Sequence, residues 1–332
     1  MTKNSEFSDF FIDFSNESFQ LPIAKNSQQQ EIIDFINYFF ENEMIPVQTS
    51  GSTGTPKKIL LPKKAMLQSA SMTASFLNLK RADSALMCLP VQYIAGKMMI
   101  VRAVHSQMKI FFTEPKTQIL IEQPYDFCAM TPMQAQNSMK DLHQIQTLIL
   151  GGAQVTHQLE NQLAKIPSRI YETYAMTETI THIAMRQLNH QKAFHTLENI
   201  EISSDQRDCL VIKTPYFHEK IQTNDVVEIL NDKSFKLLGR IDNIINSGGI
   251  KINPETLENL LRPYISHEFI VHFKTDSKLG QKVVLVIEAN EIAEITYPAD
   301  LIPKNQQPKE VVFVPKLPRT PNGKVKRGAL EF

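Results

Sequence analysis

Thr49-Ser50-Gly51-Ser52-Thr53-Gly54-Thr55-Pro56-Lys57 is the stretch that decides how this chain is interpreted. Its nine residues combine hydroxyl side chains with two glycines and a lysine. Glycine lets backbone N–H groups approach an anion closely, because no Cβ intervenes. Hydroxyl groups donate further hydrogen bonds, and the lysine adds a positive charge. This order of residues predicts a loop that binds a polyphosphate.

Two other interpretations of the loop fit less well. The Walker A pattern, G-x-x-x-x-G-K-[ST], requires a different spacing. Here Gly51 and Gly54 are three residues apart, Lys57 follows Pro56, and Lys58 stands where a magnesium-binding hydroxyl belongs. A solvated turn is the second alternative, because Ser, Thr and Gly are common in turns. The order of the residues favours the phosphate loop over both.

Length and composition limit the class of protein. A chain of 332 residues suggests two domains, or one large and one small, and 42% hydrophobic residues supply a sizeable core. The formal net charge of zero indicates no basic face, so nucleic acid is not an expected partner. There is no run of about 18 apolar residues and no signal-peptide pattern, so we expect no membrane span and a cytoplasmic location. The cysteines lack metal-ligand spacing, which predicts reduced thiols at Cys88, Cys128 and Cys209.

The first two thirds of the chain alternate short apolar runs with amphipathic segments. This alternation predicts an α/β fold with a mostly parallel sheet and flanking helices. Helices are expected at residues 29–40, 64–76 and 96–105, and strands at 59–61, 85–89, 109–112, 127–130 and 147–150. The last of these strands stops at Gly151-Gly152, so a tight turn should lie at the sheet edge where α/β proteins bind ligands.

From Cys209 onward the pattern favours strands. Strands are expected at 210–212, 226–230, 234–238, 269–273 and 283–288, with a helix at 254–261. The prolines of the tail predict an extended, loop-like segment from Pro303 to Pro321. A domain boundary is expected at Gly239-Arg240. It separates a large N-terminal domain with a β subdomain, residues 1–239, from a small, mobile α+β domain, residues 240–332.

Four further segments give the phosphate loop its context. They are Tyr174-Ala175-Met176-Thr177-Glu178, Thr223-Asn224-Asp225, the run 239–255 that begins Gly239-Arg240-Ile241-Asp242, and Pro318-Arg319-Thr320-Pro321-Asn322-Gly323-Lys324. In this order they resemble the Y-G-x-T-E, T-G-D, G-R-x-D-D-x-I-x-x-G-G-x-K and P-R-T-x-x-G-K motifs of the adenylate-forming superfamily, which includes acyl-CoA synthetases and luciferases. Ala175 and Asn224 replace glycines, and Asn243 replaces an acid. Asn224 is expected to preserve a turn there, since asparagine tolerates positive φ.

The resemblance implies an ATP site. Its phosphate residues would be Thr49, Ser50, Gly51, Ser52, Thr53, Gly54, Thr55 and Lys57. Gly151, Gly152, Ala153 and Tyr174 would flank adenine. Asp225 would bind the ribose hydroxyls, and Arg240 the ribose or a phosphate. Thr177 would contact the α-phosphate, and Glu178 would bind Mg²⁺, which prefers carboxylate oxygen.

The resemblance also implies a two-step reaction. A carboxylate attacks the α-phosphorus of ATP, with Lys324 as the adenylation lysine, and gives an acyl-adenylate and pyrophosphate. The small domain then rotates about Asp242, the hinge residue. The thiol of coenzyme A displaces AMP along a path lined by Ser247, Gly248 and Gly249.

Two features of the sequence indicate that the carboxylic acid substrate is o-succinylbenzoate. Only 48 residues precede the phosphate loop, as in the compact o-succinylbenzoate–CoA ligases of menaquinone biosynthesis. The segment that begins Leu89-Pro90-Val91-Gln92-Tyr93 resembles their L-P-x-x-[HY]-I-x-G motif beside the acyl pocket. A core position is an equal alternative for Tyr93. The acyl-pocket candidates are Tyr93, Gly96, Lys97, Thr181, His182 and Arg186.

Other functions stay open from the sequence. One is another acyl- or aryl-CoA synthetase, or an adenylation enzyme that loads a carrier protein. A tunnel lined with small apolar residues would favour a fatty acid, and a buried basic or hydroxyl group at the far end of the pocket would favour o-succinylbenzoate. A nucleotide-binding regulator without catalysis is opposed by the presence of Lys57, Glu178, Asp225 and Lys324 together. Both a monomer and a homo-oligomer are compatible with the sequence.

Overall fold

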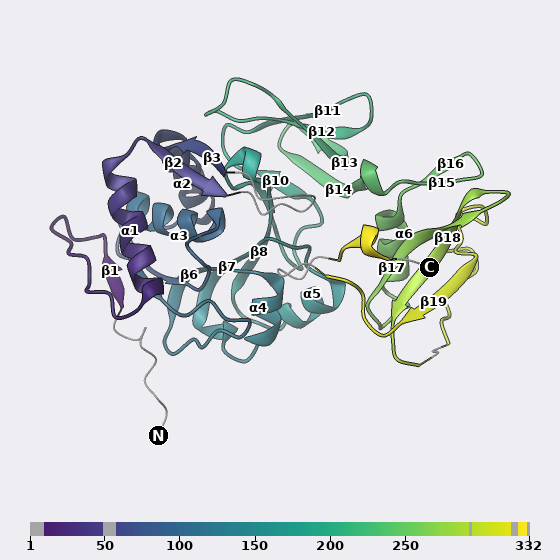
Figure 1. Cartoon of the computed structure of the whole chain (residues 1–332), viewed down its shortest axis with the longest axis horizontal. Helices are drawn as coiled ribbons and strands as arrows, with labels where there is room; N and C mark the ends of the chain where they lie inside the picture. The colour runs from purple at the N-terminus through teal and green to yellow at the C-terminus, as the bar shows by residue number, and fades with distance from the viewer. Residues whose placement is uncertain (1–9, 49–57, 292–293, 320–324, 331–332) are drawn as a thin grey trace. The chain divides into compact units, whose positions relative to one another are not determined.

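The structure is a computed structural model that describes residues 10–48, 58–291, 294–319 and 325–330. The chain divides into two compact units (Figure 1). The first comprises Met1–Ile200 and Thr214–Glu219, and the second comprises Glu201–Lys213 and Lys220–Phe332. The predicted phosphate loop and Lys324 lie outside the described residues. The domain boundary at residues 239 and 240 stays a prediction.

The first unit is built on a mixed sheet with the strand order β1-β5-β4-β6-β7-β8-β9-β10. Its strands are β1 (Phe11–Asp13), β4 (Ser84–Met87), β5 (Lys109–Phe112), β6 (Tyr125–Met130), β7 (Ile145–Leu150), β8 (Arg169–Ala175), β9 (His182–Gln187) and β10 (Phe194–Thr196). Strands β4 to β8 pair in parallel, whereas β1, β9 and β10 pair antiparallel. Nearly every residue of β6 and β7 is buried, as expected for strands covered on both faces. The predicted α/β class is confirmed.

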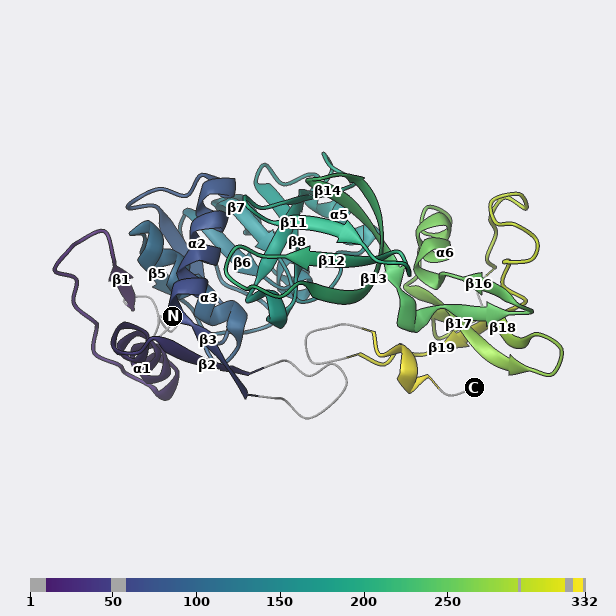
Figure 2. The same ribbon diagram turned by 90° about the horizontal axis from the view of Figure 1, so that it is seen from above.

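Helices cover this sheet on both faces (Figure 1). They are α1 (Ser27–Glu41), α2 (Lys63–Leu77), α3 (Ile94–Ser106), α4 (Pro132–Asn137) and α5 (His157–Leu163). Figure 2 shows α2 and α3 side by side. The side chain of Asn26 caps α1 by accepting from the Gln29 N–H over 2.9 Å. Asn78 and Gln107, both in left-handed conformation, end α2 and α3.

A two-stranded hairpin carries the predicted phosphate loop. Strands β2 (Met44–Gln48) and β3 (Lys58–Pro62) pair antiparallel, and Gln48 lies opposite Lys58. These paired strand ends are the described residues that directly precede and follow residues 49–57. Gln48 also forms a parallel bridge with Tyr93, so the base of the loop contacts the start of α3.

The second unit begins with an antiparallel sheet in the order β14-β13-β12-β11. Its strands are β11 (Glu201–Ser204), β12 (Cys209–Lys213), β13 (Ile221–Asn231) and β14 (Ser234–Arg240). The elements that follow are β15 (Ile245–Ser247), β16 (Ile250–Ile252), α6 (Pro254–Leu261), β17 (Phe269–Asp276), β18 (Gly280–Glu288) and β19 (Glu310–Val314). These strands form a second sheet in the order β16-β15-β18-β17, and β19 pairs with β18. Figure 2 shows α6 beside this sheet, and Leu257 and Leu261 join Phe269, Val271 and Leu285 in a buried core.

The prediction of a loop-like tail is wrong over residues 310–314. This segment forms β19, which pairs in parallel with β18. Pro308 and Pro315 flank the strand and lie outside it, so their missing N–H groups interrupt no ladder. Across the described ranges of both units, no helix has the length and apolar character needed to cross a membrane.

Candidate active site

The glycine turn after β7 is fixed by close contacts. The N–H of Gly151 donates to the Met130 carbonyl over 3.1 Å. A Cβ atom on Gly151 would lie 2.8 Å from the hydroxyl of Thr173, so a larger residue would require the Thr173 side chain to move. Gly152 has φ +84°, a conformation that glycine adopts readily. The turn predicted at this sheet edge is confirmed, and its role beside adenine stays a prediction.

A buried ion network holds the segment that follows this turn. The carboxylate of Glu172, 5% exposed, accepts from the Val155 N–H over 2.8 Å and from Arg186 Nε over 2.6 Å. Arg186 also binds Glu160 over 3.0 Å. Burial raises the pKa of Glu172, and the charge of Arg186 opposes that rise. The guanidinium of Arg186, proposed for the acyl pocket, therefore already has two carboxylate partners.

The segment predicted to bind ATP and magnesium follows β8. Tyr174 is 7% exposed, and its ring meets Phe194 edge-on with centroids 6.0 Å apart. Thr177 and Glu178 lie in a short 3₁₀ turn. The carboxylate of Glu178 is exposed and forms no hydrogen bond or ion pair with any residue that the structure describes.

This free carboxylate fits a magnesium site. Within the described ranges, no group of three or more His, Cys, Asp or Glu residues could hold a metal ion without other ligands. Mg²⁺ often takes one protein carboxylate, with phosphate oxygens and water completing its shell. Glu178 suits that arrangement, and its role as the ligand stays a prediction.

Arg102 is a buried cation with no acidic partner among the described residues. It lies on α3, is 2% exposed, and donates from Nη2 to the Thr181 hydroxyl over 3.1 Å. It forms no ion pair with any described residue, and its Nε atom has no hydrogen-bond partner among them. Burial lowers the pKa of Arg102 to about 9. A buried charge is costly unless it is paired, so this side chain is suited to bind an anionic ligand.

His182 lies next to Thr181 at the start of β9 and is 2% exposed. Its Nε2 atom is 2.8 Å from the hydroxyl of Thr73 on α2. Burial, and then the charge of Arg102, hold the pKa of His182 well below its usual range. The structure thus brings two predicted residues, Thr181 and His182, together with Thr73 and Arg102, which the sequence analysis missed. A lone charge within the apolar run Met98-Met99-Ile100-Val101-Arg102-Ala103 is the signal that could have revealed Arg102.

The other acyl-pocket candidates lie at the start of α3. A Cβ on Gly96 would lie 2.2 Å from the Pro90 carbonyl oxygen, so glycine is required for this close approach. Lys97 Nζ lies 4.5 Å from the centre of the Phe35 ring. Tyr93 is 52% exposed, which contradicts the core alternative. It lines a cavity of about 260 Å³ with Gln28 and Glu31 of α1 and Leu89 and Phe112.

The predicted ribose and hinge residues share one network in the second unit. Arg240 binds Asp225 over 2.9 Å through Nη1 and Asp242 over 2.7 Å through Nη2. The side-chain amide of Asn224 donates to Asp242 over 3.0 Å. The turn predicted at Asn224 is wrong, because Asn224 lies within β13 and is not among the described residues with positive φ.

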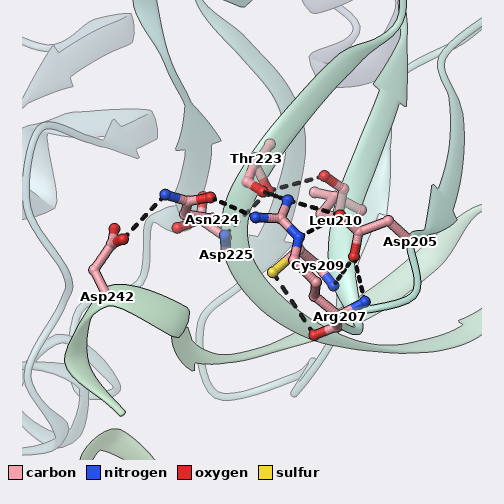
Figure 3. Close-up of polar contacts among 8 residues, drawn as sticks. All are labelled: Asp205, Arg207, Cys209, Leu210, Thr223, Asn224, Asp225 and Asp242. Carbon is pink, nitrogen blue, oxygen red and sulfur yellow. Dashed lines mark hydrogen bonds and ion pairs between the residues drawn. The ribbon is translucent and has the colours of Figure 1, made fainter.

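Arg207 supports this network from the β11–β12 connection, a contribution that the sequence analysis missed. Its guanidinium binds Asp205 over 2.7 Å, the Asn224 side-chain oxygen over 3.2 Å and the Thr223 carbonyl over 3.1 Å (Figure 3). The Thr223 hydroxyl in turn donates to the Leu210 carbonyl over 2.9 Å. The backbone on both sides of Asn224 is therefore fixed, which places Asp225 beside Arg240.

The predicted coenzyme A path is a tight turn between β15 and β16. Gly248 and Gly249 have φ of +59° and +83°, so both occupy the left-handed region that glycine favours. The Gly248 N–H donates to the Leu279 carbonyl over 2.8 Å. Both glycines are exposed, whereas Ser247 is buried. The turn offers an accessible stretch of backbone, and a contact with coenzyme A stays a prediction.

The ends of the segment that contains Lys324 are anchored. Arg319 forms an antiparallel bridge with Val325, and the Lys326 N–H donates to the Pro318 carbonyl over 2.8 Å. Arg327 binds the carboxylate of Glu258 over 2.7 Å. These contacts fix the described residues on either side of 320–324 within the second unit.

Comparison with known proteins agrees with this arrangement. Residues 47–200 match the AMP-binding enzyme family. The solved structure of an acyl-CoA synthetase (AMP-forming)/AMP-acid ligase II-like protein from Dyadobacter fermentans is 32% identical, with a TM-score of 0.64, over 92% of this chain and 94% of that one. The 2-succinylbenzoate--CoA ligase of Bacillus cereus (strain Q1) is 23% identical over 92% of this chain and 73% of its own length.

A further solved structure shares the fold. The o-succinylbenzoate coenzyme A synthetase MenE of Bacillus subtilis, in complex with ATP and magnesium, has a TM-score of 0.71 at 18% identity, over 86% of this chain and 69% of that one. The likeness to the Dyadobacter fermentans protein covers nearly the full length of both chains at a higher identity. The chain belongs to the family of AMP-binding enzymes.

Proposed function

We propose that this chain is an ATP-dependent ligase that joins o-succinylbenzoate to coenzyme A through an acyl-adenylate, a step of menaquinone biosynthesis. Membership of the AMP-binding family supports the adenylation chemistry. Curated relatives that span most of this chain carry the name 2-succinylbenzoate--CoA ligase, which supports the substrate. The proposal places the enzyme in the cytoplasm, where ATP and coenzyme A are available.

The observation that carries the choice of substrate is the buried, unpaired guanidinium of Arg102. o-Succinylbenzoate has two carboxylates, and only one of them is activated. The other needs a cationic partner once it leaves water, and Arg102 with the Thr181 hydroxyl supplies a charged and a neutral hydrogen-bonding group. A fatty acid has no second anion to offer, so it would leave the Arg102 charge buried and unpaired.

Adenylation in this site depends on positioning and charge neutralisation. Glu178 would hold Mg²⁺, which when bound would supply positive charge to screen the phosphates. Thr177 donates to the α-phosphate, and the loop at residues 49–57 holds the departing pyrophosphate. The role assigned to Lys324 is to place its ammonium group between the attacking carboxylate and the α-phosphate, where it would reduce the repulsion between two anions. Asp225 and Arg240 fix the ribose, so that attack can proceed in line.

Thioester formation uses other residues of the same chain. The predicted small domain, residues 240–332, turns about Asp242, which withdraws Lys324 and brings the turn of Ser247, Gly248 and Gly249 to the acyl-adenylate. Both glycines are exposed, and their lack of side chains leaves room for a narrow thiol-bearing arm. The thiol attacks the mixed anhydride and AMP departs.

The test is identification of the products. The full chain is incubated with ATP, Mg²⁺ and coenzyme A, together with o-succinylbenzoate, benzoate, succinate or decanoate, and thioesters and AMP are quantified by liquid chromatography and mass spectrometry. We expect AMP and a coenzyme A thioester in equal amounts, with o-succinylbenzoate as the best acid. A higher kcat/KM with decanoate or benzoate would replace the proposed substrate. AMP release that requires a pantetheinylated carrier protein in place of coenzyme A would replace the proposed acceptor.

A further inference from the structure

The backbone turns sharply at Ile180, directly after the predicted magnesium-binding segment. Ile180 has φ 68° and ψ −59° and is fully buried. The Thr181 N–H donates to the Thr179 carbonyl over 2.8 Å, which closes a three-residue γ-turn. Positive φ is unfavourable for a β-branched residue, because its branched Cβ crowds the backbone. Such strained conformations persist only where the surroundings enforce them, and they are concentrated at functional sites.

The Thr179 side chain and backbone enforce the turn from within. The Thr179 hydroxyl lies 2.8 Å from the Thr181 carbonyl oxygen and 3.0 Å from that of Met176, and it accepts from the Met176 N–H over 3.3 Å. A hydroxyl has one proton, so it donates to one of these carbonyls at a time. Thr179 is completely buried, and water cannot replace these bonds. The hydroxyl thus ties together the two ends of the turn.

Tyr216 enforces the turn from outside. It comes from Thr214–Glu219, a segment between β12 and β13 that belongs to the first unit. Its phenol donates to the Thr179 carbonyl over 2.8 Å. That carbonyl also accepts from the Thr181 N–H, so both of its lone pairs are used. Burial raises the pKa of Tyr216, so the phenol keeps its proton and remains a donor.

The strained turn separates two groups with different tasks in adenylation. Thr177 and Glu178 come just before it, and the Thr181 hydroxyl that accepts from Arg102 comes just after it. A change of backbone angle at Ile180 would alter the distance between these groups. Thr177 and Glu178 act at the α-phosphate and the metal, whereas Arg102 and Thr181 bind the second carboxylate of the substrate. The distance between these two pairs must stay fixed, because one substrate molecule reaches from one pair to the other.

We propose that Tyr216 and Thr179 are positioning residues, which hold the Ile180 turn and so set Thr177 and Glu178 at the correct distance from Thr181 and Arg102. This inference rests on the proposed function. It assigns to Tyr216, remote in the sequence from every motif, an effect on metal and substrate binding that it exerts through a backbone carbonyl. The residues on both sides of the turn keep their own chemical roles.

The experiment compares variants that each remove one hydroxyl. Tyr216→Phe removes the phenol, and Thr179→Val removes the internal bond, whereas Thr179→Ser retains a hydroxyl. Tyr125→Phe is the matched control, because this tyrosine is also buried and hydrogen-bonded, to Gln123 over 3.3 Å, and lies outside the site. Thermal unfolding establishes that each protein is folded.

Three readouts separate a positioning role from a general loss of structure. The first is kcat and KM in carboxylate-dependent ATP–pyrophosphate exchange. The second is Mn²⁺ binding in the presence of ATP, measured by electron paramagnetic resonance of the free ion, which needs no turnover. The third is hydrogen–deuterium exchange of a peptide that covers residues 176–184, which reports on the turn itself.

We expect Tyr216→Phe and Thr179→Val to lower kcat at least tenfold, to weaken Mn²⁺ binding at least threefold and to accelerate exchange in the peptide. Thr179→Ser and Tyr125→Phe should stay within twofold of the wild type in all three. Wild-type values for Tyr216→Phe in kcat and Mn²⁺ binding would overturn the proposal, and so would equal losses in Tyr125→Phe. If either site variant fails to fold, the other decides. Absence of exchange in the wild type with every acid would refute the proposed function instead, and the Mn²⁺ and peptide measurements would still test the turn.

Discussion

The Nη2 atom of Arg102 lies 3.1 Å from the hydroxyl of Thr181, and both side chains are buried. The contact joins helix α3 to the residue that directly precedes β9, whose first residue, His182, bonds Thr73. The Thr181 hydroxyl accepts one hydrogen bond from the Arg102 guanidinium but does not neutralise its charge. The guanidinium can therefore still bind an anion. This contact links the fold of the first unit to the choice of a dicarboxylate substrate.

Replacement of Arg102 by methionine should stabilise the protein while it impairs activity. Methionine has a similar length and no charge, so the variant no longer buries an unpaired cation. We expect the free energy of unfolding in urea to rise by about 1–3 kcal/mol in the absence of substrate. A decrease of similar size would mean that Arg102 is a structural residue, and it would remove the main support for the dicarboxylate. Arg102→Lys, which keeps the charge, serves as the control and should gain no stability.

Arg186 gives the opposite prediction. Its removal leaves Glu172 buried without its cation, so Arg186→Met should lower the free energy of unfolding by about 3 kcal/mol. Addition of Glu172→Gln should recover part of that loss, because a neutral amide is less costly to bury than a charge. Urea unfolding of the two single variants and the double variant measures this coupling. Unchanged stability together with a raised KM for the acid would instead favour the acyl-pocket role predicted for Arg186.

His182 should make stability fall as the solution is acidified. Its pKa is held well below the ordinary value by burial and by Arg102, whereas an unfolded histidine binds a proton below about pH 6.5. The unfolded state then holds more protons, so the free energy of unfolding decreases from pH 6.5 to 5.5 by about 1 kcal/mol for this group.

The measurement is urea unfolding at pH 7.5, 6.5 and 5.5 for the wild type and His182→Gln. Glutamine keeps a polar group near the Thr73 hydroxyl and does not titrate in this range. The wild type should lose about 1 kcal/mol more than the variant between pH 6.5 and 5.5. Parallel curves for the two proteins would contradict a neutral, buried His182.

Lys324 should act in only one half of the reaction. Lys324→Ala should abolish acyl-adenylate formation, since it removes the charge between two anions, and should leave thioester formation from supplied acyl-adenylate within about threefold of the wild type. Lys326→Ala, two residues further along and exposed, is the control and should retain both activities. Single-turnover kinetics of each half separate these effects. Equal loss of both halves in Lys324→Ala would refute the rotation about Asp242.

Much of the fold could be predicted, because buried parallel strands appear in sequence as short apolar runs. The runs at 127–130 and 147–150 correspond to β6 and β7, and the expected helix at 254–261 has the bounds of α6. Strand β8 was missed, because one of its buried positions is the charged Glu172, which interrupts the apolar pattern in Arg169-Ile170-Tyr171-Glu172-Thr173. The prolines around β19 concealed a strand whose pairing with β18 is set by tertiary contacts.

The parts of the site that consist of consecutive residues could be predicted from the sequence. Contacts between residues far apart in the sequence could not. The glycine turn at 151–152 follows from one strand end. The ion pair of Glu172 and Arg186 depends on the register of β8 and β9, which places these residues opposite each other. The contact of Tyr216 with Thr179 joins residues 37 positions apart through an irregular segment, and no local pattern indicates it.

The most direct test of the account is carboxylate-dependent ATP–pyrophosphate exchange by the wild type and Arg102→Met, with o-succinylbenzoate, benzoate, succinate and decanoate as acids. The wild type should exchange fastest with o-succinylbenzoate. Arg102→Met should lose about 30–100-fold in kcat/KM with that acid, which corresponds to about 2–3 kcal/mol for a charged hydrogen-bonded contact, and less than threefold with decanoate. No exchange with any acid in folded wild-type protein, or an Arg102→Met variant that retains its preference for o-succinylbenzoate, would contradict the account.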